Sequence, residues 1–153
     1  MVTKDNRQVW HKEAMKLREA NPEHVLFLCV ANSARSQLAE GIARSLTFPT
    51  VRISSAGSSP ASVRNHAVQV MQEIGLDISE YHSKSVDEVE RPVDAVITLC
   101  AEEACPVWLD EVVRLHWPLP DPAIVRGTEK KQLDAFRAAR DELSRRLGVL
   151  FGA

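Results

Sequence analysis

The chain has 153 residues, 26 % of them charged, and a formal net charge of −2, which suits one ordinary globular domain. This charge gives no reason to expect binding to nucleic acid or to an anionic membrane surface. No apolar run approaches the roughly 20 residues of a membrane span, and no apolar segment follows the charged start, so we expect neither an anchor nor a signal peptide. We therefore expect a cytoplasmic protein.

The chain begins with an expected helical extension. Residues 5–20 contain neither Gly nor Pro, and the Asn-Pro pair that follows them ends a helix. The apolar face of this helix is modest, which favours a packing role over a binding role. We divide the chain into an N-terminal helical extension, residues 1–22, and a main domain, residues 23–153.

A strand, a short loop and a helix come next. Residues 25–28 form an apolar run typical of a strand buried on both faces, and a helical pattern begins at Arg35. The inward N–H groups of such a loop and the positive end of the helix form a concave site for an anion. The loop residues expected around that anion are Val30, Ala31, Asn32, Ser33 and Ala34.

Cys29 ends this strand and Arg35 begins the helix, so both side chains can face one bound oxyanion. The N–H donors, the helix dipole and the guanidinium favour the thiolate, which makes Cys29 a candidate nucleophile. Arg35 can bind two oxygens of a tetrahedral anion at once. Asn32 tolerates a left-handed backbone, and Ser36 can donate a hydrogen bond to the sulfur. The alternative is a buried structural cysteine near a surface arginine.

Strands and helices alternate through the rest of the chain, which is typical of an α/β domain with a parallel sheet. In such a sheet the functional residues gather at the C-terminal ends of the strands. The expected elements, in chain order, are a strand over 51–54, a helix capped by Ser59 and stopped by Gly75, a short helical stretch over 85–90, a central strand over 93–99, a strand over 112–115 and a final helix capped by Thr128.

Two more cysteines and an aspartate follow the later strands. Cys100 comes directly after the strand over 93–99, Cys105 follows a helix-like turn over 101–104, and Asp121 lies in a proline-rich loop. Three cysteines cannot form a complete set of internal disulfides, which favours free or catalytic thiols in a reducing compartment. Taken alone, Cys100 fits a small core residue as well as a reactive thiol. Two thiols after a central strand, opposite a nucleophilic Cys29, favour redox chemistry.

The motif from Cys29 to Ser36, directly after a strand, resembles the anion loop of low-molecular-weight protein tyrosine phosphatases and of the arsenate reductases that share their fold. The continuation Asn-Ser-x-Arg-Ser-Gln-x-Ala-Glu-Gly, residues 32–41, resembles the reductase branch. The resemblance implies a three-layer domain, with helices on both faces of a four-stranded parallel sheet of strand order 2-1-3-4. It also implies that Asp121, in an Asp-Pro pair, is the general acid. Tyrosine phosphatases of the family generally have aromatic residues just after this Asp, whereas Ala123-Ile124-Val125 follow here, which argues against a phosphotyrosine substrate.

The thioredoxin-coupled reductases of this family have a second cysteine after the same Thr-Leu pair and a third slightly later. The resemblance implies that Cys29 attacks arsenate, that Cys100 then attacks Cys29 and releases arsenite, and that Cys105 carries the disulfide outward to thioredoxin or a similar dithiol. Phosphate and sulfate would compete as oxyanions. No tightly bound cofactor and no metal are expected. Cysteines five residues apart on an intact helix exceed the roughly 7 Å Cα limit of a disulfide, so the segment 100–108 must unwind on oxidation.

Lys84 indicates whether this protein needs a potassium ion beneath its anion loop. In potassium-dependent reductases of this type an acidic residue helps to bind a cation beneath the anion loop, and Lys84 stands at its position in this chain. We expect its ammonium group to replace the cation electrostatically, so that no potassium is required. Glu40 and Ser55, which match other members of that cation site, would then hydrogen-bond Lys84 or the loop. The alternative is a solvated Lys84.

Two other functions remain open. A phosphomonoesterase would use Cys29, Arg35 and Asp121 in the same way. In that mechanism Cys100 and Cys105 would have no role. In a noncatalytic oxyanion sensor, Asp121 would have no role. The sequence does not distinguish thioredoxin from glutaredoxin with glutathione, or from another thiol, as the reductant.

Overall fold

The computed structural model describes residues 4–101 and 105–152. None of the helices in this part of the chain has the length and apolar character that a membrane span requires. The elements in chain order are α1 (Lys4–Glu19), β1 (His24–Cys29), α2 (Arg35–Leu46), β2 (Arg52–Gly57), α3 (Asn65–Gln72), the 3-10 helix η1 (Val86–Glu88), β3 (Ala95–Thr98), β4 (Val113–His116), the 3-10 helix η2 (Pro122–Ile124) and α4 (Glu129–Phe151).

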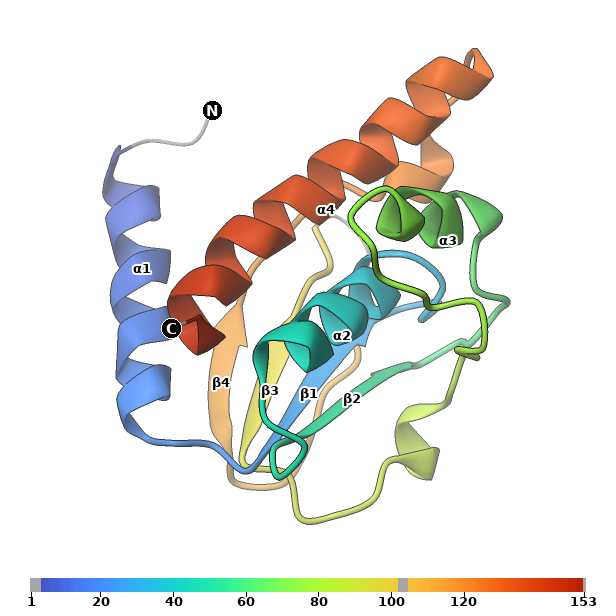
Figure 1. The fold of residues 1–153 in the computed structure, drawn as a ribbon. Coiled ribbons are helices and arrows are strands. Elements are labelled where there is room, and N and C mark those ends of the chain that lie inside the picture. The colour runs from blue at the N-terminus through green and yellow to red at the C-terminus, as the bar shows by residue number, and fades with distance from the viewer. Residues whose placement is uncertain (1–3, 102–104, 153) are drawn as a thin grey trace.

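Four parallel strands form one sheet in the order β2-β1-β3-β4, which confirms the predicted topology (Figure 1). All six residues of β1 are buried, as expected for an apolar strand with neighbours on both sides and cover on both faces. Leu28 pairs with Ala56 of β2 and with Thr98 of β3. This register brings the end of β1, at Cys29, beside the end of β3.

The two faces of the sheet are covered unequally. All four α-helices contribute to the larger core, on the side of Val25 and Phe27 (Figure 1). Leu26 and Leu28 point to the other face, where Trp108 is buried against them. This second layer consists of η1 and irregular segments in the described residues, so it is thinner than the first.

The helix predicted to start after Ser59 begins only at Asn65, so its predicted start was wrong. Residues 59–64 instead run along the anion loop, whose carbonyls they hydrogen-bond: the backbone N–H of Ser59 donates to Val30 at 2.9 Å, and that of Arg64 to Ser33 at 3.0 Å. These tertiary bonds replace the bonds of a first helical turn. Strand β2 is correspondingly longer than predicted and ends at Gly57, where any side chain would overlap the Val30 carbonyl.

Helix α1 packs beside the C-terminal part of α4 (Figure 1). Trp10 is buried in the larger core, where its ring meets that of Trp117 edge to face at a centroid distance of 6.2 Å. The Arg146 guanidinium lies over both rings, at 5.0 and 5.7 Å. We propose that the extension, residues 1–22, acts as a packing element on the domain of residues 23–153.

Candidate active site

The loop between β1 and α2 encloses a cavity of about 220 Å³. Asn32 in this loop has φ +49°, the left-handed backbone that its sequence position favours. Cys29 is a free thiol with only 2 % of its surface exposed. The lining of the cavity brings together most of the residues expected there, namely Cys29, Val30, Ala31, Ser33, Ala34, Arg35 and Asp121.

Arg35 is buried and joins three segments of the site. Its Nη1 donates to the carbonyl of Leu99 at 3.3 Å and to that of Leu119 at 3.0 Å. Its Nη2 lies 3.7 Å from Oδ2 of Asp121. One guanidinium therefore ties the anion loop to the end of β3, directly before Cys100, and to the loop that carries Asp121.

Asp121 is fixed by the turn that it begins. It is the N-cap of η2, and its Oδ1 accepts a hydrogen bond from the backbone N–H of Ala123 at 2.9 Å. Pro122 occupies the first turn and restricts the backbone there. The other carboxyl oxygen faces Arg35 and the cavity, so this carboxyl is placed where a ligand in the loop could meet it.

Cys100 and Cys105 form a disulfide with their Cα atoms 5.6 Å apart, inside the range that such a bond allows. Cys100 is buried, with 2 % exposure, whereas Cys105 is partly exposed. Residues 105–109 form no helix, and the unwinding of the segment 100–108 on oxidation stays a prediction. Most of the turn predicted over 101–104 falls on residues 102–104, outside the described residues.

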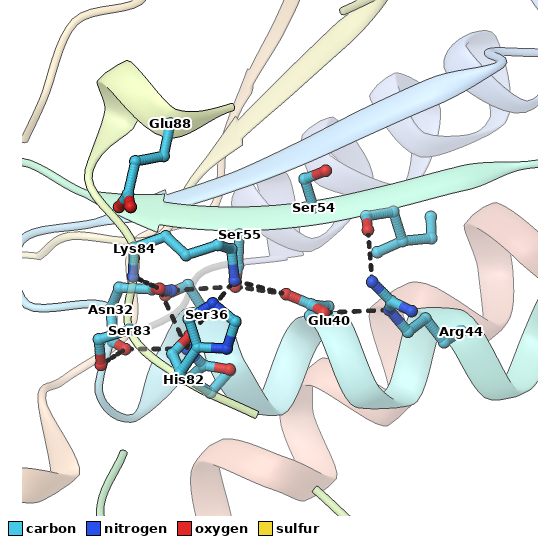
Figure 2. Close-up of polar contacts among 12 residues, drawn as sticks. Asn32, Ser36, Glu40, Arg44, Ser54, Ser55, His82, Ser83, Lys84 and Glu88 are labelled. Carbon is cyan, nitrogen blue, oxygen red and sulfur yellow. Dashed lines mark hydrogen bonds and ion pairs between the residues drawn. The ribbon is translucent and has the colours of Figure 1, made fainter. Parts of the chain in front are cut away.

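A chain of hydrogen bonds supports the loop from beneath (Figure 2). The Asn32 side chain donates through Nδ2 to Ser36 Oγ at 2.8 Å and to Ser55 Oγ at 3.0 Å. Its Oδ1 accepts from the backbone N–H of Lys84 at 2.9 Å, which fixes the orientation of the amide. Ser36 Oγ lies 2.8 Å from Cys29 Sγ. Because Ser36 already accepts from Asn32, its own hydrogen is available to the sulfur.

The same chain leads in the other direction to a buried carboxylate. Ser55 Oγ donates to Oε1 of Glu40 at 2.6 Å, and the Glu40 side chain is only 4 % exposed. Arg44 Nε lies 3.0 Å from Oε2, and Lys84 Nζ lies 3.8 Å from Oε1. Two cations therefore offset the charge of this carboxylate, and Figure 2 shows it between Ser55 and Arg44.

Two supporting side chains were missed by sequence reasoning. Gln37 Nε2 donates to the Asn32 carbonyl oxygen and to its Oδ1, both at 3.0 Å. Ser83 Oγ donates to the same carbonyl at 2.7 Å. Gln37 offered a signal, because it belongs to the motif of residues 32–41 that resembles the reductase branch. Ser83 offered none, since it lies in a polar connection far along the chain.

A loop that presents backbone N–H groups, a guanidinium and a thiol to one cavity suits a tetrahedral oxyanion that the thiol attacks. The fold and site thus fit an α/β enzyme that acts on an oxyanion. The model of the family called low molecular weight phosphotyrosine protein phosphatase matches residues 24–153. The chain belongs to this family.

Three similar proteins are each named arsenate reductase. The arsenate reductase of Halalkalibacterium halodurans is 39 % identical over 130 residues, which are 83 % of this chain and 94 % of that protein. A solved arsenate reductase in the phosphate-binding state has TM-score 0.71 and 31 % identity, covering 84 % of this chain and 96 % of the other. A thioredoxin-dependent arsenate reductase of Corynebacterium glutamicum has TM-score 0.58 and 26 % identity, covering 90 % and 69 %.

Proposed function

We propose that this protein reduces arsenate to arsenite through Cys29, Cys100 and Cys105, and that thioredoxin restores it. One observation carries the proposal: a disulfide joins Cys100 and Cys105 at the end of β3, beside a free cysteine in an anion loop. Similarity to arsenate reductases over most of the chain supports the same reaction.

The first step is attack on arsenic. Arsenate binds in the loop, where N–H groups and the Arg35 guanidinium hold its oxygens. The Cys29 thiolate forms a bond to arsenic, and one arsenic–oxygen bond breaks as Asp121 protonates the leaving oxygen, which departs as water. Ser36, at 2.8 Å from the sulfur, stabilises the thiolate before attack.

The second step reduces arsenic. Cys100 attacks the sulfur of Cys29, the sulfur–arsenic electron pair passes to arsenic, and arsenite leaves a Cys29–Cys100 disulfide behind. The amide of Leu99 donates to the Leu28 carbonyl at 2.9 Å, so Cys29 lies opposite Leu99, one residue before Cys100. In ideal strand geometry, with a spacing of about 4.8 Å and a rise of about 3.3 Å, two Cα atoms so placed would be roughly 6 Å apart. That separation suits a disulfide.

The third step moves the disulfide outward. Cys105 attacks Cys100, which forms the Cys100–Cys105 bond and releases Cys29 as a thiolate for the next arsenate. The bond in the structure is the bond that this step would form, and Cys29 is free, which supports the proposed order. A dithiol then reduces the outer disulfide. We place the enzyme in the cytoplasm, because the cycle needs a reducing compartment.

Arsenate-dependent oxidation of NADPH by purified thioredoxin and its reductase tests this function. We expect continued oxidation and one arsenite released per NADPH consumed. The same assay with glutathione and glutaredoxin tells the reductants apart. No arsenite with thioredoxin, glutaredoxin or a chemical dithiol would contradict the proposal, and steady hydrolysis of a small aryl phosphate in that case would favour a phosphomonoesterase.

We further propose that Lys84 takes the place of a bound cation beneath the loop. Its Nζ lies 3.8 Å from the buried Glu40 carboxylate, which would otherwise rely on Arg44. We expect arsenate turnover to be the same in potassium chloride and in choline chloride at equal ionic strength. Lys84→Ala opens the site and should make turnover rise with added potassium, whereas Lys84→Arg retains a cation and should not. Potassium stimulation of the wild-type enzyme would contradict this role.

A further inference from the structure

Arg64 contacts both the anion loop and the turn that carries Asp121. It is the residue directly before α3, and its backbone N–H donates to the carbonyl of Ser33 at 3.0 Å. Its side chain reaches a different segment, since Nη2 donates to the carbonyl of Ala123 at 3.0 Å. Ser33 lines the anion cavity, and Ala123 lies two residues after Asp121. One residue therefore joins two parts of the candidate active site.

The backbone of Arg64 is held from both sides. Its N–H is bonded to Ser33, and its carbonyl accepts from the N–H of Ala67 at 3.0 Å, at the start of α3. Three residues of α3, among them Ala67, are buried in the larger core and anchor the helix. The Arg64 side chain therefore extends from a point that is fixed relative to the anion loop.

The turn that carries Asp121 has weak hydrogen bonds of its own. The N–H of Ile124 lies 3.5 Å from the Asp121 carbonyl, and the N–H of Val125 lies 3.4 Å from the Pro122 carbonyl. Both distances exceed the usual limit of about 3.2 Å for such bonds. The position of this turn therefore depends strongly on contacts from other segments.

Ala123 passes the contact with Arg64 on to the Asp121 carboxyl. Its carbonyl accepts from Arg64, while its N–H donates to Oδ1 of Asp121 at 2.9 Å. The other carboxyl oxygen, Oδ2, lies 3.7 Å from Nη2 of Arg35. If Ala123 moved away from Arg64, the carboxyl bonded to it would move away from Arg35 and the cavity.

Helix α3 also contacts the far end of the same connection. Nε2 of His66 lies 2.7 Å from Oε1 of Glu129, the first residue of α4. Between Ala123 and Glu129 the chain passes through Gly127, whose φ of +122° is readily available only to glycine. The start of α3 therefore holds this connection on both sides of its most permissive backbone position.

We propose that Arg64 is a positioning residue that holds the Asp121 carboxyl where it can protonate the leaving oxygen of arsenate. This inference deepens the proposed function and rests on it. The proton passes from Asp121 to that oxygen, which departs as water, and the carboxylate takes up another proton from solvent. Arg64 is itself exposed, so it acts through Asp121. A displacement of about 1 Å at a reacting group can cost up to about 10²-fold in rate.

Arg64→Met tests the proposal, because methionine retains an unbranched side chain but cannot donate a hydrogen bond. We expect the maximal rate of arsenite release in a single turnover of the reduced enzyme to fall about tenfold. The arsenate concentration that gives half of this rate should stay nearly unchanged. Arg64→Lys can still donate one bond to the Ala123 carbonyl and should retain most of the wild-type rate.

A double-mutant cycle with Asp121→Asn distinguishes positioning from a general structural role. Asparagine can still accept from the Ala123 N–H, but it cannot act as an acid. In this background Arg64→Met should change the rate by less than about twofold, because the group that Arg64 positions is already inactive. An equal loss in both backgrounds would overturn the proposal. A raised half-saturating arsenate concentration with an unchanged maximal rate would also overturn it, since Arg64 would then act by attracting the oxyanion.

Arg18→Met is the matched control. Arg18 is likewise exposed, and its Nη1 donates to the Val149 carbonyl at 3.0 Å, between α1 and α4. This variant should retain the wild-type rate. Both Met variants should have melting temperatures close to that of the wild type, because one exposed hydrogen bond contributes little to stability.

The same measurements separate this inference from the function on which it rests. If the reduced wild-type enzyme releases no arsenite, the proposed function itself fails. If the wild type releases arsenite and Asp121→Asn is equally fast, arsenate reduction stands, but Asp121 is not the acid and Arg64 has nothing to position. A wild-type rate in Arg64→Met, with a slow Asp121→Asn, would overturn the role of Arg64 alone.

Discussion

Cys100→Ser and Cys105→Ser are each expected to abolish repeated arsenate turnover with thioredoxin while retaining any hydrolysis of a small aryl phosphate. Cys100→Ser removes the thiol that attacks the Cys29 sulfur and so breaks the sulfur–arsenic bond. Arsenite should therefore not be released at all. In Cys105→Ser no thiol is left to attack the Cys29–Cys100 disulfide. One arsenite per enzyme should therefore be released before the reaction stops. Arsenite counted per enzyme, with mass spectrometry of the trapped Cys29–Cys100 disulfide, measures both outcomes.

Cys29→Ser provides the reference for these two variants, because both the reductase and the phosphatase mechanisms need that sulfur. It should lose arsenate turnover and aryl phosphate hydrolysis together. If Cys100→Ser and Cys105→Ser continue to turn over arsenate with thioredoxin, the relay is wrong. If the wild-type enzyme binds arsenate and transforms neither substrate, the oxyanion sensor becomes the better interpretation.

Arg35→Lys is expected to lower kcat/KM for arsenate by about 10²- to 10³-fold. A lysine keeps the charge but loses the planar group that can bind two oxygens of one anion. It also cannot reproduce the geometry by which Arg35 Nη1 holds both the Leu99 and the Leu119 carbonyls, at 3.3 and 3.0 Å. Steady-state kinetics with arsenate, and the inhibition constant of phosphate as a competing oxyanion, measure the two losses.

Arg52→Lys is the matched control for this substitution. Arg52 is about half exposed, with its side chain 48 % accessible, and pairs with Glu90 on the surface. Exposed pairs of this kind contribute little to stability, so the control should have nearly wild-type kinetics. An Arg35→Lys enzyme with wild-type kcat/KM and unchanged phosphate inhibition would show that bidentate binding by Arg35 is not part of the mechanism.

Local sequence signals predicted those parts of the structure that depend on near neighbours. Helix α2 begins at Arg35 as expected, and Thr128 caps α4 by accepting from the Lys131 N–H at 3.2 Å. Ser85 caps η1 in a capping box with Glu88. Each of these contacts spans a few residues, so the residues that make it are visible together in the sequence.

The helix predicted from Ser59 shows where such signals stop being sufficient. A serine before a proline is a sound helix start by local rules. In the folded chain, however, the backbone N–H groups of Ser59, Ala61 and Arg64 donate to carbonyls of the anion loop, about thirty residues earlier, and the helix starts later. A tertiary demand for hydrogen bonds outweighed a local preference, as it does near sites whose backbone geometry is fixed.

The sequence by itself predicted the anion loop, because a thiol, a run of small residues and an arginine at fixed spacing after a buried strand constrain one another over seven positions. It also determined the parallel α/β fold, since alternating apolar strands and amphipathic helices have few other ways to bury their surfaces. Only the tertiary structure decided that Arg35 holds carbonyls 64 and 84 residues away. Trp108 is likewise buried in a cluster with Leu26 and Leu28 of a distant strand. These contacts join segments that are far apart in the chain. Neither hydrophobic periodicity nor local capping patterns indicate such contacts, so they form only when the whole domain packs.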